Sequence, residues 1–321
     1  MRWLPVIAWG LVACSGEGAG AGAGAGASAE ASASAGAGAS AEASASAEAG
    51  GGAAGPGPAH LACEEVDFAD SVDLPEASGA VWVEPSFGLP AHVVAVGDSR
   101  NRGAFAVIDA DTGALLARGT LPLDPGASDD LEGLARTGDR YHAINSGGWV
   151  RTFRRTGAAR FERLDAYPLH PEMLCSSPKR TNCGMDFEGL CLAAPGPGCD
   201  GFAASKARGE LVCLELDPRG RLTAAPEGTL KVAPRAVLSG CAITPEGDRL
   251  LAGMNLLGGN SVVAVSPWRD PASARLEPLG PLGAGNAEAI AAGPGGAIVR
   301  LSDTAAAISA ARKVSCRAGG R

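Results

Sequence analysis

The chain repeats one short pattern five times, at intervals of about fifty residues. In four of the five copies a polar or acidic residue lies three positions before a small residue, and an apolar run follows. The aligned small residues are Gly79, Gly133, Gly189, Gly240 and Ala289. A period of this length indicates one supersecondary unit per repeat, and such units bury their apolar faces only by packing against their neighbours.

Each repeat continues with turn residues and with short apolar or alternating runs, which predict further β-strands. Second strands are expected at 93–98, 141–145, 201–205, 249–255 and 298–302, third strands at 103–109, 148–153, 210–216 and 261–266, and fourth strands at 115–123, 161–169, 222–230 and 275–282. We therefore predict an all-β chain that forms a five-bladed β-propeller of four-stranded antiparallel blades. A six-bladed propeller and a two-sheet β-sandwich are the alternatives. The aromatic content of only 4% favours the sandwich, since propeller blades usually pack on aromatic rings.

The fifth repeat runs out after its third strand, near Cys316. The spare segment 64–68, which precedes the first repeat, is expected to supply the missing outer strand and to close the ring. A disulfide between Cys63 and Cys316 would then lock the two ends of the folded region together.

The first sixty residues differ in composition from the rest. Arg2 and the apolar run 4–13 have the pattern of a secretion signal, and Leu11-Val12-Ala13-Cys14 resembles the lipobox of bacterial lipoproteins. That resemblance implies cleavage before Cys14 and its lipidation. Gly, Ala, Ser and Glu dominate 15–59, which predicts a disordered tether. We predict a signal peptide at 1–13, a lipid-anchored tether at 14–59 and the propeller at 60–321, held at the periplasmic or extracellular face of a bacterial envelope membrane.

Charge and hydropathy restrict the partners of this chain. The net charge is −8 and Lys and Arg form no cluster, which argues against binding to nucleic acid or to an anionic lipid surface. No apolar run is long enough for a transmembrane helix. Apart from the membrane reached through the anchor, we expect a small ligand or an envelope protein as partner, and a monomer.

Nine cysteines are present, and removing Cys14 as the lipid site leaves an even number for four disulfides in an exported domain. Cys175 and Cys183 flank a proline-containing loop and are expected to pair locally. No pairing is predicted for the other four. No Cys-x-x-Cys motif occurs, which disfavours a zinc site. The predicted disulfide residues are Cys63, Cys175, Cys183, Cys191, Cys199, Cys213, Cys241 and Cys316.

The repeat also predicts a gathering of acidic side chains. Strand side chains two positions apart share a face, so Asp130 and Glu132 are expected on one side, with Leu131 inside the blade packing. Asp186 and Glu188, separated by Phe187, follow the same pattern. The ends of the second strands add Asp98, Asn145, Lys206, Asn255 and Asp303 to the same rim.

If the first strands line a central channel, carboxylates and amides surround one mouth of it. Grouped carboxylates repel one another unless a proton or a cation neutralises them, and hard oxygen ligands suit Ca²⁺. The alternative is that these acids only accept hydrogen bonds from backbone amides and hold the blades in register. The fourth repeat breaks the pattern with Val237 and Ser239.

Several of these segments resemble the SdiA-regulated proteins, which belong with the esterase-like phytase propellers. The resemblance rests on 76–79, 96–99, 109–113 and 129–135, with further copies at 186–190 and 286–290, and covers roughly residues 63–316. It implies a calcium-associated propeller, often extracytoplasmic, with phosphoesterase activity in part of the group. Carried over position by position, it implies metal ligation by Glu76, Asp130, Glu132, Asp186, Glu188 and Glu288.

No nucleophile elbow, zinc-protease motif, phosphate-binding loop or dinucleotide fingerprint is present. The basic residues that could hold a phosphate are expected to be solvated surface residues: Arg100, Arg102, Lys179, Arg180 and Lys206. The leading prediction is a non-catalytic envelope lipoprotein whose acidic mouth binds a divalent cation, a small ligand or a protein. A calcium-dependent phosphoesterase and a purely structural interaction scaffold are the two alternatives.

Overall fold

The chain folds into five four-stranded antiparallel sheets, as a computed structural model shows for residues 61–124, 128–256, 259–283, 285–304 and 308–318. The predicted signal peptide, Cys14 and the tether lie outside the described residues. The first sheet consists of β3 (Ala77–Val83), β4 (His92–Gly97), β5 (Ala104–Asp109) and β6 (Leu115–Thr120), and the second of β7 (Gly133–Thr137), β8 (Arg140–Ile144), β9 (Trp149–Gly157) and β10 (Arg160–Pro168). The third consists of β11 (Phe187–Leu192), β12 (Gly201–Ser205), β13 (Glu210–Leu216) and β14 (Leu222–Lys231), and the fourth of β15 (Leu238–Ile243), β16 (Leu250–Leu256), β17 (Gly259–Ser266) and β18 (Arg275–Gly280). The fifth consists of β19 (Asn286–Ala292), β20 (Ala297–Asp303), β21 (Ser309–Ala318) and β1 (Leu61–Val66).

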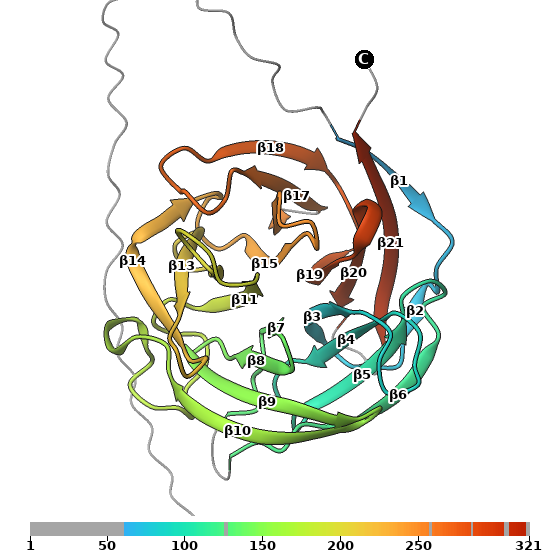
Figure 1. The fold of residues 1–321 in the computed structure, drawn as a ribbon, viewed down its shortest axis with the longest axis horizontal. Coiled ribbons are helices and arrows are strands. Elements are labelled where there is room, and N and C mark those ends of the chain that lie inside the picture. Colours follow the sequence, from blue (N-terminus) through green and yellow to red (C-terminus); the bar gives the residue numbers. More distant parts are fainter. Residues whose placement is uncertain (1–60, 125–127, 257–258, 284, 305–307, 319–321) are drawn as a thin grey trace, which may run out of the picture. The chain divides into compact units, whose positions relative to one another are not determined.

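The sheets surround a common axis as the blades of a propeller, with β3, β7, β11, β15 and β19 innermost (Figure 1). The prediction of five blades is therefore confirmed, and the six-bladed and sandwich alternatives are wrong. A two-residue strand, β2 (Ser71–Val72), pairs with β21, and two short 3-10 turns, η1 (Pro171–Met173) and η2 (Pro294–Gly296), complete the described elements.

The N-terminal strand closes the ring. β1 pairs antiparallel with β21 as the outermost strand of the last blade, with Cys63 opposite Cys316. These two cysteines form a disulfide across 253 residues of sequence. Both the closure and the bridge were predicted from the sequence. In the chain-entropy model, a cross-link over so long a loop stabilises the folded state by about 5 kcal/mol.

The hydrophobic core lies between the blades. Five clusters of buried side chains each fill one interface between neighbouring sheets. Leu131 and Phe187, the residues between the paired acids, are fully buried in two of these clusters, as the alternation predicts. Small side chains provide much of the packing, which explains how a chain so poor in aromatic residues builds a propeller.

The remaining three disulfides lie within or between blades. Cys175 pairs with Cys183 as expected, and Cys199 pairs with Cys213. Cys191 pairs with Cys241 and joins the inner strands β11 and β15 of adjacent blades. Four disulfides are typical of a protein from an oxidising compartment. No helix among the described residues is long and apolar enough to span a membrane.

The repeated small residue brings the inner strands together at the axis. A Cβ on Gly133 would lie 2.4 Å from the Leu190 nitrogen, and one on Gly189 would lie 2.6 Å from the Gly240 Cα. Only glycine permits such an approach of backbone to backbone. The cavity beside this glycine ring (Gly79, Gly133, Gly189 and Gly240) measures about 10 Å³, which is the room of about one water. The axis therefore narrows at the glycine ring to about the room of one water, with a wider mouth on either side.

Candidate cation-binding mouth

The acidic side chains gather on the side of the glycine ring from which the inner strands begin. We call this group the acidic mouth; it comprises Asp98, Asp130, Glu132, Glu188 and Glu288. Four of the five inner strands shift register at their start, as between Phe187 and Gly189 in β11. The extra residue at each shift forms a β-bulge, which changes the direction of its side chain relative to the regular alternation of the strand. Ser78, Glu188, Ser239 and Glu288 occupy this bulge position.

Three carboxylates lie close enough to share one ion. Asp98, Asp130 and Glu132 each offer an oxygen, and these oxygens lie within 4.8 Å of one another. Two oxygen ligands of a single Ca²⁺, each about 2.4 Å from it, are at most about 4.8 Å apart. The hard oxygen donors and their spacing therefore fit a calcium ion.

Hydrogen bonds hold the triad in place. Asp130 is only 2% exposed, and its Oδ2 accepts hydrogen bonds from the backbone N–H and the hydroxyl of Ser146. The Asp98 N–H donates to the Glu76 carbonyl at 2.8 Å, which fixes the residue that directly follows β4. Two neighbouring blades thus supply the three carboxylates.

One cation partly balances the acidic mouth. Lys206 Nζ lies 3.0 Å from Glu188 Oε1, and the carboxylate side chain is only 5% exposed. Lys206 directly follows β12 and therefore lies at the mouth, as its predicted place on the rim implies. Its side chain is 37% exposed and paired with Glu188, so it is only partly the solvated surface residue that was also expected. Glu288 is held by Asn286, whose Nδ2 donates to Glu288 Oε1 at 2.8 Å.

Burial and crowding shift the acidic mouth toward its protonated form. Burial raises the pKa of Asp98 to about 6, and the charges of Asp130 and Glu76 act in the same direction. Burial also raises the pKa of Asp130, although its hydrogen bonds from Ser146 oppose the shift.

The glutamates shift further. Burial raises the pKa of Glu188 to about 8 although the Lys206 ammonium opposes it. Burial and the charge of Asp303 raise the pKa of Glu288 to about 7. Burial and the Glu188 charge together raise the pKa of Glu132 well above its ordinary value. Near neutral pH, and with no other cation present, the mouth therefore carries bound protons.

Two of the predicted ligands lie at the periphery. Glu76 is half-buried and accepts a hydrogen bond from Asn101 Nδ2 at 3.1 Å. Asp186 has φ 51° and a buried Oδ1 that no described hydrogen-bond donor reaches. The structure thus brings Asp130 and Glu132 together in the triad and sets Glu188 and Glu288 beside it.

Asp98 is the triad member missing from the predicted ligands. The sequence placed it on the rim, since it ends a second strand, but gave no reason to prefer it to Asn145 or Asn255. The fourth blade adds no carboxylate, as Val237 and Ser239 predicted; the Ser239 hydroxyl instead donates to the Ala287 carbonyl at 3.1 Å.

No protein-family model and no curated protein matches this chain. Among solved structures it is similar to Myxococcus xanthus glutaminyl cyclase, with 14% identity and a TM-score of 0.49 over 82% of this chain and 100% of that one. It is also similar to the PQQ-bound form of aldose sugar dehydrogenase from Streptomyces coelicolor, with 12% identity and a TM-score of 0.49 over 81% of this chain and 99% of that one. At sequence identities this low, the similarity concerns the fold alone and does not indicate an activity.

Proposed function

We propose that this chain is a lipid-anchored envelope protein whose propeller binds a divalent cation, Ca²⁺ foremost, at the acidic mouth. The observation that carries the proposal is the triad of carboxylate oxygens from the half-buried Asp98 and the buried Asp130 and Glu132. Its donor set is hard, anionic and nearly pre-formed, which favours Ca²⁺ over softer metals. Export and anchoring are supported by the lipobox-like segment at 11–14 and by the four disulfides.

The state of the mouth without metal supports the same proposal. The five carboxylates face the Lys206 ammonium and the charges of two buried guanidiniums, Arg151 beside Asp130 and Arg300 beside Glu288. Carboxylates still outnumber cations, so the mouth needs further positive charge, which protons or a metal ion can supply. Metal ligands bind in their deprotonated form, so Ca²⁺ must displace protons from the mouth. We therefore expect calcium uptake to strengthen as the pH rises from about 6 to 8, the range in which Asp98, Glu288 and Glu188 titrate.

Calorimetric titration with Ca²⁺ tests the site directly. We expect one ion per chain in the unmodified protein and a loss of at least about tenfold in affinity when Asp130→Ala and Glu132→Ala are combined. Glu227→Gln, which removes an exposed carboxylate elsewhere, is the matched control and should leave uptake unchanged. Equal uptake by the double variant would refute the assignment. Lower thermal stability in that variant, with no metal dependence in either protein, would identify the acids as purely structural.

The position of Lys206 supports a second candidate, a calcium-dependent phosphoesterase of the kind that the SdiA-regulated resemblance implies. An ion pair with Glu188 places Lys206 in the acidic mouth, and an ammonium beside a metal site can hold a phosphate oxygen. A panel of phosphate mono- and diesters, assayed with Ca²⁺ and with chelator, tests this reading. Turnover that chelation and Glu188→Gln both abolish would establish the enzyme, and absence of turnover throughout the panel would leave the binding function.

A further inference from the structure

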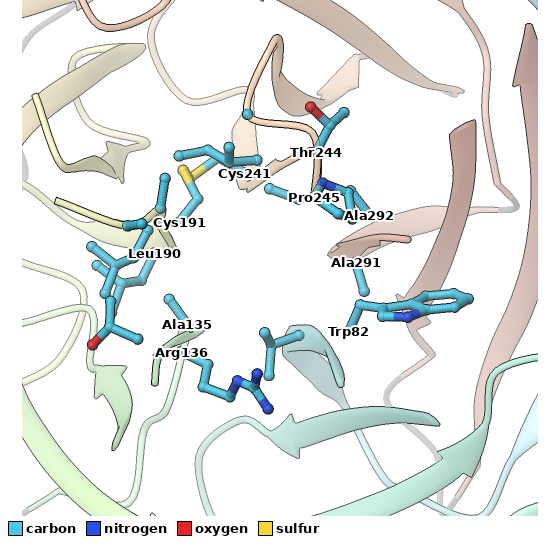
Figure 2. Close-up of a pocket in the computed structure, with 18 of the residues that line it drawn as sticks. Trp82, Ala135, Arg136, Leu190, Cys191, Cys241, Thr244, Pro245, Ala291 and Ala292 are labelled. Atoms are coloured by element: carbon cyan, nitrogen blue, oxygen red, sulfur yellow. A yellow bond between two sulfur atoms is a disulfide. The ribbon is translucent and has the colours of Figure 1, made fainter. Parts of the chain in front are cut away.

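A cavity of about 690 Å³ opens on the other side of the glycine ring, where the inner strands end. We call it the apolar mouth. Figure 2 shows its lining, in which side chains from all five inner strands and the loops after them surround one central space. Between this cavity and the acidic mouth, the glycine ring narrows the axis to about the room of one water. Its volume falls in the range typical of small-molecule sites.

About half of the surface that lines the apolar mouth is apolar, and the other half is polar. Leu190, Ala135 and Ala291 line it, together with the disulfide between Cys191 and Cys241, and all five residues are at most 4% exposed. The Cys191–Cys241 bridge ties two inner strands together beside the cavity. The site is therefore held by the covalent and β-sheet framework, which lowers the cost of ordering it around a ligand.

Two arginines reach the apolar mouth, and they differ in their partners. Arg269 is fully engaged, because it donates to the carbonyls of Cys199 at 2.9 Å and Ala194 at 2.7 Å and stacks over the Trp268 ring. Arg136 is half-buried in the wall, and among the described residues its guanidinium has no hydrogen bond and no ion pair. A partly desolvated guanidinium without a partner is suited to bidentate binding of a carboxylate.

The remaining charges limit the ligand to a monoanion. Glu84 and Glu246 are exposed carboxylates on the same lining, and Glu246 also accepts a hydrogen bond from the Gly295 N–H at 3.3 Å. A phosphate or a polyanion would bring a second negative charge toward them, and the charge of Arg269 is already partly balanced by Asp200, whose Oδ1 lies 3.9 Å from Arg269 Nη1.

We propose that the apolar mouth binds a small organic molecule that carries one carboxylate on an apolar body. The carboxylate pairs with the guanidinium of Arg136, and the apolar body fills the space between Leu190, Ala135, Ala291 and the Cys191–Cys241 disulfide. This site does not depend on the cation site, because its lining contains none of the five carboxylates of the acidic mouth.

Calorimetry with 2-naphthoate, its carboxamide and 2-naphthyl phosphate tests the proposal on the purified protein in the presence of chelator. The three probes share one apolar body and differ in charge. We expect 2-naphthoate to bind one-to-one and the carboxamide to bind at least about tenfold more weakly, because it lacks the charge-assisted pair with Arg136. The phosphate should also bind more weakly than the carboxylate.

Variants assign the effect to Arg136. In Arg136→Gln the tenfold preference for carboxylate over carboxamide should disappear, whereas Arg160→Gln, which removes an exposed guanidinium on β10, should keep it. Arg136→Lys should retain part of the preference, and equal melting temperatures show that each variant is folded. Val81→Trp, which fills the cavity, should abolish binding of all three probes. Absence of naphthoate binding at millimolar concentration, a tighter phosphate, or an unchanged preference in Arg136→Gln would overturn the proposal.

Discussion

The two mouths of the propeller axis arise from the same five strands, yet their chemistry is opposite. On one side of the glycine ring, carboxylates lie on the inner strands and on the residues beside their starts, and most of them are buried. On the other side the same strands carry alanine, leucine and a disulfide. Buried charge needs a proton or an ion for compensation, whereas a buried apolar wall needs only a ligand of suitable shape. One strand can therefore serve two kinds of site, provided that a barrier keeps them apart. In this protein glycine provides the barrier, because it lets the backbones meet.

The largest effect is expected from breaking that barrier. Gly133→Ala places a Cβ 2.4 Å from the Leu190 nitrogen and 2.6 Å from the Gly189 carbonyl carbon, and backbone atoms cannot yield as a flexible side chain does. We expect a loss of about 3 kcal/mol or more in the free energy of unfolding, measured by denaturant titration. Gly259→Ala is the control, since nothing lies within 4 Å of its Cβ, and the account requires it to cost far less.

The second-largest expected effect is a pH dependence of the free energy of unfolding, to which the acidic mouth contributes and the apolar mouth does not. The raised pKa values of Asp98, Glu288 and Glu188 mean that the folded state holds more protons than the unfolded chain between about pH 4.5 and 8. Stability contributed by these groups is therefore greatest below the ordinary carboxyl pKa and is lost as the pH rises. In chelator we expect the free energy of unfolding to fall by a few kcal/mol between pH 5 and pH 8.

Calcium should reverse that loss, because it replaces the departing protons at the acidic mouth. Thermal unfolding at pH 8 with and without Ca²⁺ measures the reversal. Naphthoate affinity at the apolar mouth should change little over the same pH range, since Arg136 stays charged. A stability that rises between pH 5 and pH 8 in chelator would contradict the protonated acidic mouth.

A smaller effect concerns the charge balance of the acidic mouth. Lys206→Met removes the ammonium that pairs with Glu188, so the field at the triad becomes more negative. We expect calcium affinity to increase roughly threefold to tenfold, as measured by calorimetry at low ionic strength. Lys179→Met, an exposed residue, is the charge-matched control. A loss of calcium affinity in Lys206→Met would show that the lysine organises the site instead of opposing the ion.

The smallest expected effect tests whether the two mouths bind their ligands independently. Glu246→Gln removes one exposed carboxylate from the lining of the apolar mouth and should tighten naphthoate binding by about twofold, since solvent and salt screen the charge. Calcium affinity at the acidic mouth should stay the same. A parallel change in both affinities would show that the mouths communicate through the ring.

The sequence predicted the architecture well because the fold is a repeat. Five aligned small residues implied five blades, and the missing fourth strand near Cys316 implied closure by the N-terminal strand. Each inference needed only local pattern and the requirement that every blade be complete. The bridge between Cys191 and Cys241 could not be chosen in the same way, because it joins different blades.

The sites were harder to predict because they depend on register between distant strands. Alternation from Asp130 to Glu132 was a sound guide, but Asp98 joins them from another blade, and Lys206 enters the mouth only through the end of β12. The apolar mouth left no motif, since its wall consists of residues such as Ala135 and Ala291 that resemble ordinary core. Only the convergence of five strand ends turns them into a cavity.

Proton release on calcium binding is the most direct test of the central claim that the acidic mouth exchanges protons for a divalent cation. Calorimetry at pH 7 in two buffers of different ionisation enthalpy counts the protons released per ion. The account predicts one bound Ca²⁺ per chain with release of about one proton or more, and a loss of both in Asp98→Asn combined with Glu132→Gln. Absence of binding, or binding without proton release that persists in this double variant, would contradict it.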